Sequence, residues 1–361
     1  MRKTAVSLVS VVCLIALCFS LCACADKGNE NAVVPMENDL SVDEQSDIGL
    51  YFFASDGSHK RYSEDISTDY FDPQKPTIAF FHGWMTEDFE EGEIYEFPEF
   101  NKKVLEAGYN MCALDYCRHA KVLTYLFNYI WMGYEDSHSI ACRFAREYAA
   151  CFKNYDKEVT FLAHSFGAHT SVATAYFLSK MADQGIVGRN CLPNRMTFAD
   201  PYLGDVLLNL AGGIKGDTIE NLREKINGRS CTEVIADAMQ YLADRENIAI
   251  DVYCGMPVAY DQYLEEDDAR RQACKKKLYD TGAWTILKGL QNEFGTVGDI
   301  HMYTLYWVFE SFFVSEKCVD GQYFPTASLD NDKMRALKGK LFESTLEGLD
   351  VANDTLVEAE R

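Results

Sequence analysis

The sequence predicts an α/β fold in which a mostly parallel sheet is covered by helices on both faces. Three observations predict it. From residue 78 onward, short apolar runs alternate with longer runs in which apolar residues recur at helical spacing, a pattern typical of parallel strands joined by crossover helices. One strand-like run passes through small residues and Ser165 directly into a helix-like run. The span 49–327 is long enough for one large α/β domain.

The predicted elements follow one another along the chain. The strands are expected at 49–54, 78–81, 110–114, 159–162, 196–199 and 248–253. The helices are expected at 97–107, 140–153, 168–181 and 231–244. Sites in such sheets form at the carboxyl ends of the strands. His82, Ser165 and Asp200 all come at such ends, so we expect them to meet at one edge of the sheet.

Ser165 is the candidate nucleophile. It follows a predicted strand, with Ala163 two residues before it and Gly167 two residues after it. This is the arrangement of a nucleophile elbow, a strained strand-to-helix turn that exposes the serine hydroxyl and needs small neighbours. The usual pattern is G-x-S-x-G, from which Ala163 departs by one methyl group. The alternative interpretation is an ordinary strand-to-helix turn.

An activated serine needs a base and an acid that orients the base. When the serine lies on an elbow, both partners follow it in the chain, in the order acid and then histidine. Of the seven histidines, only His169 and His301 follow Ser165. His169 falls on the helix just after the elbow, pointing away from the nucleophile, which leaves His301 as the candidate base.

Asp200 is the candidate acid. It ends a short strand pattern at 196–199, and Pro201 after it stops the ladder. Asp251, inside the apolar strand at 248–253, is the main rival. Other acids in the interval, such as Asp237 and Asp244, lie in a helical stretch and indicate a solvated face.

The candidate oxyanion hole consists of two backbone N–H groups. One is that of Phe166, directly after the nucleophile, and the other is that of Trp84, in the loop after the strand at 78–81. The alternative for the second segment is a core strand followed by a turn glycine at Gly83.

The segments 80–84, 163–169, 195–201 and 301–311 together resemble the pancreatic-lipase-like (lipoprotein lipase) family of α/β-hydrolases. The resemblance covers residues 49–315, with all four motifs in family order. It implies an α/β-hydrolase fold, a Ser165/Asp200/His301 triad and carboxylic-ester substrates, often lipids. The chain departs from the family at Ala163, in its loops, and in having too few residues after the histidine segment for the family's C-terminal β-sandwich.

We therefore expect a serine carboxylic-ester hydrolase, most simply a lipase or esterase with an ester or lipid as its small-molecule substrate. One alternative keeps the triad and changes the substrate, giving a peptidase or a carbohydrate or cell-wall esterase. The other is a non-catalytic surface lipoprotein on a hydrolase scaffold.

The first 24 residues predict an export signal. Two basic residues precede an uncharged apolar stretch that is typical of secretory signals. The following Leu21-Cys22-Ala23-Cys24 resembles a bacterial lipobox, which implies lipid attachment at Cys24 and a tether to a membrane surface. The rival interpretation is cleavage near Ala25 and free secretion. Residues 25–48 are acidic and polar and predict a disordered spacer, and 328–361 predict a helical, acidic tail.

The formal net charge of −22 argues against nucleic acid as a partner. No cofactor motif and no metal site is predicted. Nine of the thirteen cysteines follow Cys24. An exported protein can form disulfides among them, but the pairing cannot be read from the sequence. The segments 122–134 and 283–290 are candidates for the substrate mouth and an amphipathic lid helix, each weighed against an ordinary buried or surface helix.

Overall fold

The computed structural model describes residues 48–83, 97–116, 140–203, 231–255, 269–288, 297–312, 330–345 and 355–357. All of them belong to one unit of the chain, residues 36–361. The predicted export signal with Cys24, the spacer up to residue 47, the oxyanion candidate Trp84 and the aromatic segment 122–134 lie outside the described residues.

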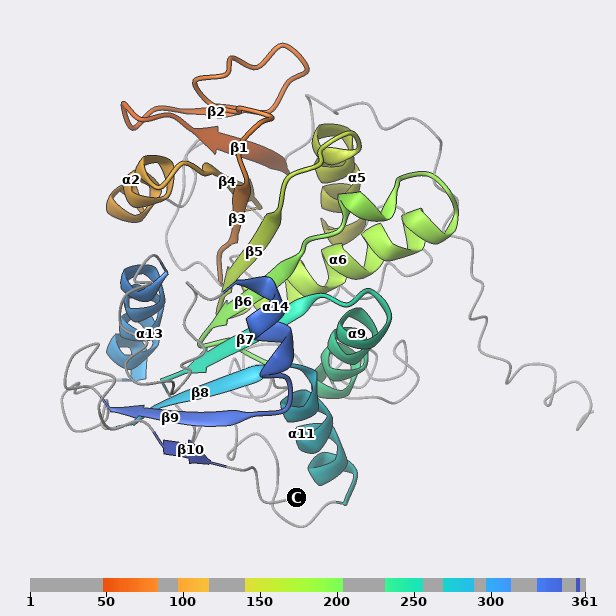
Figure 1. Ribbon diagram of the computed structural model, residues 1–361, viewed down its shortest axis with the longest axis vertical. Coiled ribbons are helices and arrows are strands. Elements are labelled where there is room, and N and C mark those ends of the chain that lie inside the picture. Colours follow the sequence, from red (N-terminus) through yellow and green to blue (C-terminus); the bar gives the residue numbers. More distant parts are fainter. Residues whose placement is uncertain are drawn as a thin grey trace, which may run out of the picture. The chain divides into compact units, whose positions relative to one another are not determined.

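A ten-stranded sheet forms the centre of the described structure (Figure 1). In chain order its strands are β1 (Gly49–Phe53), β2 (His59–Arg61), β3 (Thr77–Phe81), β4 (Asn110–Asp115), β5 (Val159–His164), β6 (Arg195–Ala199), β7 (Ala249–Cys254), β8 (Ala283–Lys288), β9 (Leu341–Thr345) and β10 (Thr355–Val357). Their order across the sheet is β10-β9-β8-β7-β6-β5-β3-β4-β1-β2. The run from β4 to β9 is parallel, while β1 pairs antiparallel with β2 and β4, and β10 with β9.

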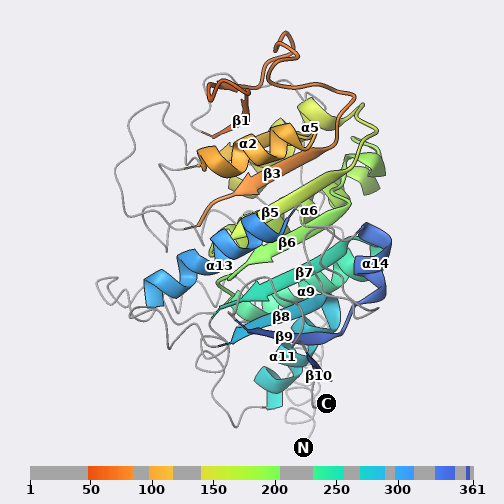
Figure 2. The ribbon, with the colours of Figure 1, turned by 60° about the vertical axis from the view of Figure 1, so that its left-hand side comes forward.

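Helices cover both faces of this sheet. One face carries α2 (Pro98–Glu106) and α13 (Val297–Ser311), and the other carries α5 (Ile140–Phe152), α6 (Gly167–Asp183), α9 (Cys231–Arg245) and α11 (Ala269–Thr281), as Figure 1 shows. Figure 2 turns the face with α2 and α13 toward the viewer. A short 3-10 helix, η2 (Arg189–Cys191), follows α6, and α14 (Asn331–Ala336) packs on β7. The predicted fold class is confirmed: this is the α/β-hydrolase fold. The strands and helices expected between residues 49 and 254 are all present, with ends shifted by at most two residues.

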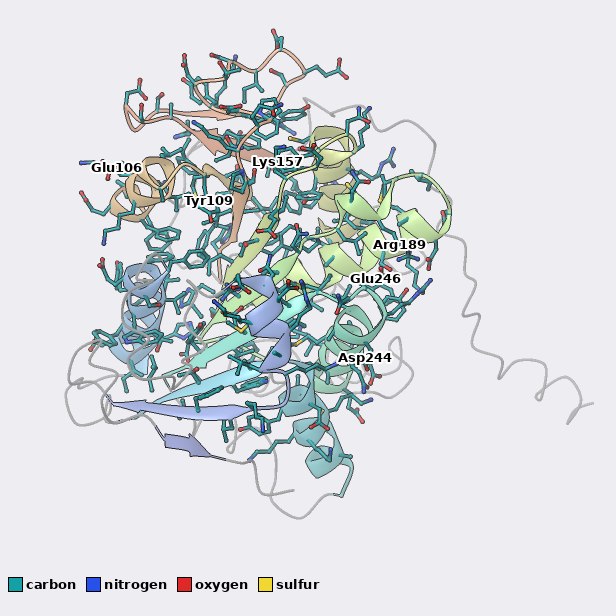
Figure 3. All side chains as sticks on the ribbon, in the orientation of Figure 1. Glu106, Tyr109, Lys157, Arg189, Asp244 and Glu246 are labelled. Atoms are coloured by element: carbon teal, nitrogen blue, oxygen red, sulfur yellow. The ribbon has the colours of Figure 1, made fainter. Side chains whose placement is uncertain are left out.

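Side chains fill the space between sheet and helices on both faces (Figure 3), and the largest fully buried ones are aromatic. Successive residues of a strand point to opposite faces, so neighbouring phenylalanines of β3 enter different cores. Phe80 packs against Phe97 and Phe309, with ring centroids 5.3 and 6.1 Å away. Phe81 packs on the other side against Phe144 of α5, at 5.3 Å. Because both faces are buried, the strands are nearly continuously apolar.

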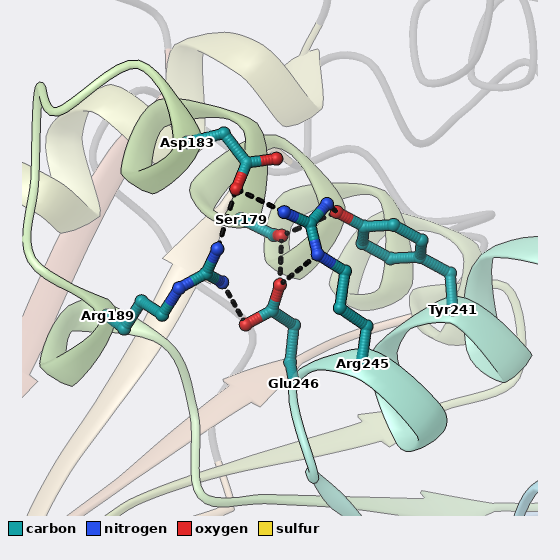
Figure 4. A network of polar contacts seen from close by, with 6 residues as sticks. All are labelled: Ser179, Asp183, Arg189, Tyr241, Arg245 and Glu246. Atoms are coloured by element: carbon teal, nitrogen blue, oxygen red, sulfur yellow. Dashed lines mark hydrogen bonds and ion pairs between the residues drawn. The ribbon is translucent and has the colours of Figure 1, made fainter. Parts of the chain in front are cut away.

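An ion-pair network joins the end of α6 to η2 and to the end of α9 (Figure 4). Asp183 accepts hydrogen bonds from Arg189 and Arg245, both at 2.6 Å. Glu246 pairs with Arg189 and accepts a hydrogen bond from the Ser179 hydroxyl at 2.7 Å. The network therefore ties together three segments that pack side by side behind the sheet.

The prediction of a lid helix at 283–290 is wrong. Residues Ala283–Lys288 form β8, a parallel strand between β7 and β9. Trp284 is 1% exposed, and its indole N–H donates to the carbonyl of Leu278 at 3.1 Å. Ile286 and Leu287 are also buried, so the run is covered on both faces. A short apolar run fits a buried strand as well as a helix, and periodicity alone does not separate the two.

The helical tail expected at 328–361 also needs correction. Only Asn331–Ala336 is an α-helix in the described part of this segment. Its last strands, β9 and β10, extend the sheet: β9 pairs parallel with β8, and β10 pairs antiparallel with β9.

Candidate active site

Ser165 lies on a sharp turn between β5 and α6. Its φ of 54° is in the left-handed region, which is strained for a residue with a side chain. The surrounding backbone holds it there: its N–H donates to the carbonyl of Ala199 at 3.2 Å, and its own carbonyl accepts the N–H of Tyr202 at 2.9 Å. The two partners are the last residue of β6 and a residue three positions after it, so the neighbouring strand and its exit maintain the strained backbone of Ser165.

Two glycines are required by close backbone contacts around this turn. A Cβ at Gly167 would lie 2.2 Å from the carbonyl oxygen of Phe81, so α6 can begin directly against the end of β3 only with glycine there. A Cβ at Gly83 would lie 2.7 Å from the Cβ of Ser165 and 3.2 Å from its Oγ. The loop after β3 therefore touches the candidate nucleophile.

Asp200 follows the last residue of β6 at the same edge of the sheet. Its φ of 42° is also left-handed, and its N–H donates to the carbonyl of Tyr253 at 2.7 Å. Oδ1 accepts the N–H of Gly255 at 3.0 Å, and Oδ2 lies 2.5 Å from Nδ1 of His301. The carboxylate is almost fully buried, with 5% of the residue exposed. Both of its oxygens thus have partners, and one holds a histidine.

His301 lies near the start of α13. Aromatic side chains fix this helix on the sheet: Phe309 stacks on Phe100 of α2 with ring centroids 4.0 Å apart, and Trp307 packs on Tyr253 of β7 at 5.3 Å. The imidazole itself is about a quarter exposed, with its side chain at 26%. Part of the ring is therefore accessible to solvent or substrate while Nδ1 is held by Asp200.

The residue before the candidate nucleophile, His164, links Ser165 to His301. The two imidazole rings lie 4.3 Å apart at 35°, and Nε2 of His164 is 3.4 Å from the backbone carbonyl of His301. A carbonyl can only accept, so this nitrogen carries the proton. Within the described residues, no hydrogen bond joins the Ser165 hydroxyl to His301. The structure thus brings Asp200 and His301 into contact and places Ser165 beside them, one residue from a side chain that touches His301.

The rival acid Asp251 lies elsewhere. It is fully buried in β7 and forms a bidentate ion pair with Arg195 of β6, at 2.8 Å to Nε and 2.7 Å to Nη2. Thr197 donates a further hydrogen bond to Oδ1 at 2.9 Å. With both oxygens engaged inside the sheet, Asp251 is not available to orient a histidine at the edge.

Of the two oxyanion candidates, the structure describes Phe166. It caps the N-terminus of α6 with helical φ and ψ of −66° and −19°. Backbone N–H groups at a helix N-terminus carry partial positive charge and are suited to an anion. Trp84 lies outside the described residues, but Gly83 directly before it is the glycine in contact with Ser165.

Three further histidines are buried around the site. Burial lowers the pKa of His82 to about 4 and that of His169 to about 3, in each case against a hydrogen bond to backbone that raises it. Burial, and then the neighbouring His301, hold the pKa of His164 well below its usual range. The sequence placed His169 correctly on the helix after the elbow, where its ring stacks on Phe166 at 5.0 Å. It gave no role to His82 or His164, although each directly follows or ends a strand at the active edge.

Among the described residues, no helix is both long and apolar enough to cross a bilayer. No group of three or more His, Cys, Asp or Glu side chains in the same residues is arranged to hold a metal ion. Cys112, Cys151 and Cys191 are thiols whose pKa values burial raises.

No protein-family model matches the chain, and no curated protein matches it in sequence. Among solved structures it is similar to an acetyl xylan esterase from Paenibacillus sp. R4, with 9% identity, 58% of this chain and 69% of that chain covered, and a TM-score of 0.31. Esterase B from Lactobacillus rhamnosis shares 12% identity, with 83% and 81% covered and a TM-score of 0.28. The esterase Est2 from Thermogutta terrifontis shares 15%, with 62% and 72% covered and a TM-score of 0.28. Membership of the pancreatic-lipase-like family stays a prediction, and the function proposed below depends on the geometry of the site.

Proposed function

We propose that this protein is a serine hydrolase of carboxylic esters, with Ser165 as nucleophile, His301 as base and Asp200 as orienting acid. The observation that carries the proposal is the 2.5 Å contact between Asp200 Oδ2 and His301 Nδ1, at the edge of the sheet where Ser165 occupies its strained turn. A carboxylate on Nδ1 selects the tautomer that leaves Nε2 free to accept a proton from a serine hydroxyl.

In the proposed reaction, Ser165 Oγ attacks the ester carbonyl carbon while its proton passes to His301. Asp200 stabilises the imidazolium that results. The carbonyl oxygen becomes an oxyanion, which the backbone N–H groups of Phe166 and Trp84 stabilise. His301 then gives its proton to the leaving alcohol, and water cleaves the acyl-enzyme by the same steps in reverse order.

The absence of a hydrogen bond between Ser165 and His301 among the described residues is compatible with this reaction. Catalytic hydrogen bonds are often long or poorly aligned in a free enzyme and tighten when substrate binds. Ser165 is also only partly buried, so the surrounding protein does not enclose it completely.

We further propose that the substrate is a lipid or a related ester, and that the protein is exported and tethered through a lipidated Cys24. The first part is tested by a series of p-nitrophenyl esters of increasing chain length. A lipase prefers long chains, whereas a carbohydrate esterase prefers acetyl esters and a peptidase cleaves amides. Lipid attachment at Cys24 is tested by metabolic labelling with a fatty acid. The label on the protein must disappear in the variant Cys24→Ala.

The decisive experiment compares Ser165→Ala with Ser171→Ala. Ser171 is a second serine near the start of α6, whose buried hydroxyl donates to the carbonyl of Ala168 at 3.0 Å. Ser165→Ala should abolish hydrolysis of p-nitrophenyl butyrate and labelling by a fluorophosphonate, with a nearly unchanged thermal melt. Ser171→Ala should keep both activities. Turnover of Ser165→Ala near the parent rate would overturn the proposed nucleophile, and an unlabelled, inactive parent protein would point to the non-catalytic alternative.

A further inference from the structure

His82 and Gly83 follow β3 at the edge of the sheet where Ser165 lies. The His82 side chain is buried, and its Nδ1 lies 2.9 Å from the carbonyl oxygen of Gly83, the next residue. Because a carbonyl oxygen can only accept, Nδ1 carries the proton and donates it. The imidazole therefore holds, by a hydrogen bond, the backbone of Gly83, the residue that contacts the candidate nucleophile.

Tyr116, the residue after β4, holds His82 in turn. Its ring stacks on the imidazole with centroids 3.9 Å apart and an angle of 13° between the planes. Its hydroxyl donates a hydrogen bond to the backbone carbonyl of His82. Tyr116 is itself fully buried. One side chain thus fixes both the ring and the main chain of His82.

The carbonyl that accepts this hydrogen bond belongs to Gly83, which lies against Ser165. A Cβ at Gly83 would collide with the serine. A peptide unit is planar, and its C=O and N–H point in opposite directions. In the proposed function the same peptide carries the N–H of Trp84, one of the two oxyanion donors. A hydrogen bond that holds the carbonyl of Gly83 would therefore also orient that donor.

We propose that His82 and Tyr116 act as one unit of positioning residues, which aims the N–H of the peptide after Gly83 at the oxyanion. The inference rests on the proposed ester hydrolysis and adds a role for two buried residues that have no part in the proposed proton transfers. Burial, which lowers the pKa of His82 to about 4, keeps the imidazole neutral near pH 7, and the carbonyl of Gly83 selects the tautomer that is protonated at Nδ1.

The other end of β3 offers a matched control. There the hydroxyl of Tyr155 donates to the backbone carbonyl of Lys75 and lies 2.8 Å from the hydroxyl of Thr77. Tyr116→Phe and Tyr155→Phe thus each remove one tyrosine hydroxyl from a carbonyl that flanks the same strand. Only the first is at the active edge.

We expect Tyr116→Phe to lower kcat for p-nitrophenyl butyrate by about ten- to a hundredfold, less than the roughly 10²- to 10³-fold loss when an oxyanion donor is removed outright. KM should change by less than about twofold, because an oxyanion donor acts on the transition state more than on bound substrate. His82→Phe, which keeps a ring and loses the donor, should lower kcat to a similar extent. The double variant should be no slower than the slower single variant, because the two residues act together. Rates are normalised to the folded fraction measured by near-UV circular dichroism.

Tyr155→Phe should lower the thermal midpoint without lowering kcat. If Tyr116→Phe and Tyr155→Phe have the same kcat, or if the effects of His82→Phe and Tyr116→Phe multiply in the double variant, the positioning role is overturned. Ser165-dependent turnover by the parent protein would still stand in that case. If the parent shows no turnover that Ser165→Ala removes, the proposed function fails first, and this inference fails with it.

Discussion

Two buried carboxylates on neighbouring strands of the sheet have opposite surroundings. Asp251, inside β7, is fully buried and bound by two of the guanidinium nitrogens of Arg195 on the adjacent strand. Asp200, just past the end of β6, is nearly as buried, but its partner is His301, which a helix from a distant part of the sequence brings to it. One carboxylate is therefore held by a guanidinium, whereas the other is held by an imidazole.

The difference follows from where each pair lies in the sheet. Inside the sheet, strand pairing places Thr197 opposite Asp251, and every carboxylate oxygen is matched by a donor on β6. A buried charge must be compensated in this way, so the Asp251 pair is a fixed part of the core. At the edge the ladder ends, the backbone of Asp200 turns to a φ of 42°, and its partner side chain is 26% exposed. The same carboxylate chemistry is structural in the first place and, in the function we propose, catalytic in the second.

The largest expected effect comes from changing Asp200, and it is an effect on activity. Asp200→Asn should lower kcat by about 10⁴-fold, because an amide at this position no longer selects the reactive tautomer of His301 or stabilises its charge. The loss in thermal stability should be small, since Asn keeps the shape of Asp. Initial rates of ester hydrolysis and a melting curve on the same preparation measure both.

The corresponding experiment at the other pair should give the reverse pattern. Arg195→Met and Asp251→Leu should each lower the free energy of unfolding by about 3–5 kcal/mol, because each leaves an uncompensated buried charge. The double variant should recover part of that loss. Urea unfolding measures the stabilities, and kcat per folded molecule should stay within about threefold of the parent value. A large loss of kcat with unchanged stability would mean that Asp251, and not only Asp200, serves the active edge.

Much of this arrangement was predictable from local sequence. Ser165 between small residues, and Asp200 at the end of a strand pattern before Pro201, are short-range signals, and the order of elements along the chain implies that they meet. The roles of Asp251 and His82 were not predictable, because they depend on the cross-strand partner Arg195 and on Tyr116 after a different strand. Sequence periodicity also could not separate a buried strand from a helix at 283–288, since this run is short and mostly apolar and fits either element.

The smallest expected effect concerns a third kind of buried titratable group, an uncharged histidine. His169 is fully buried on α6, and burial lowers its pKa to about 3, although a hydrogen bond with the backbone of Tyr202 opposes this. In the unfolded chain its pKa returns to about 6.5. Between these two values the unfolded state binds the proton and the folded state does not, so acid favours unfolding.

His169→Gln removes that titration and keeps a polar side chain. The parent protein should lose about 2 kcal/mol more unfolding free energy than His169→Gln between pH 7 and pH 5, because each excess proton of the unfolded state contributes about 1.4 kcal/mol per pH unit. Urea unfolding of both proteins at pH 7, 6 and 5 gives the difference in slope. The carboxylates common to both proteins, Asp200 and Asp251 included, cancel in that difference. Equal slopes would mean that His169 accepts its proton in the folded state, and that the sheet edge around Phe166 tolerates a charge that its burial should exclude.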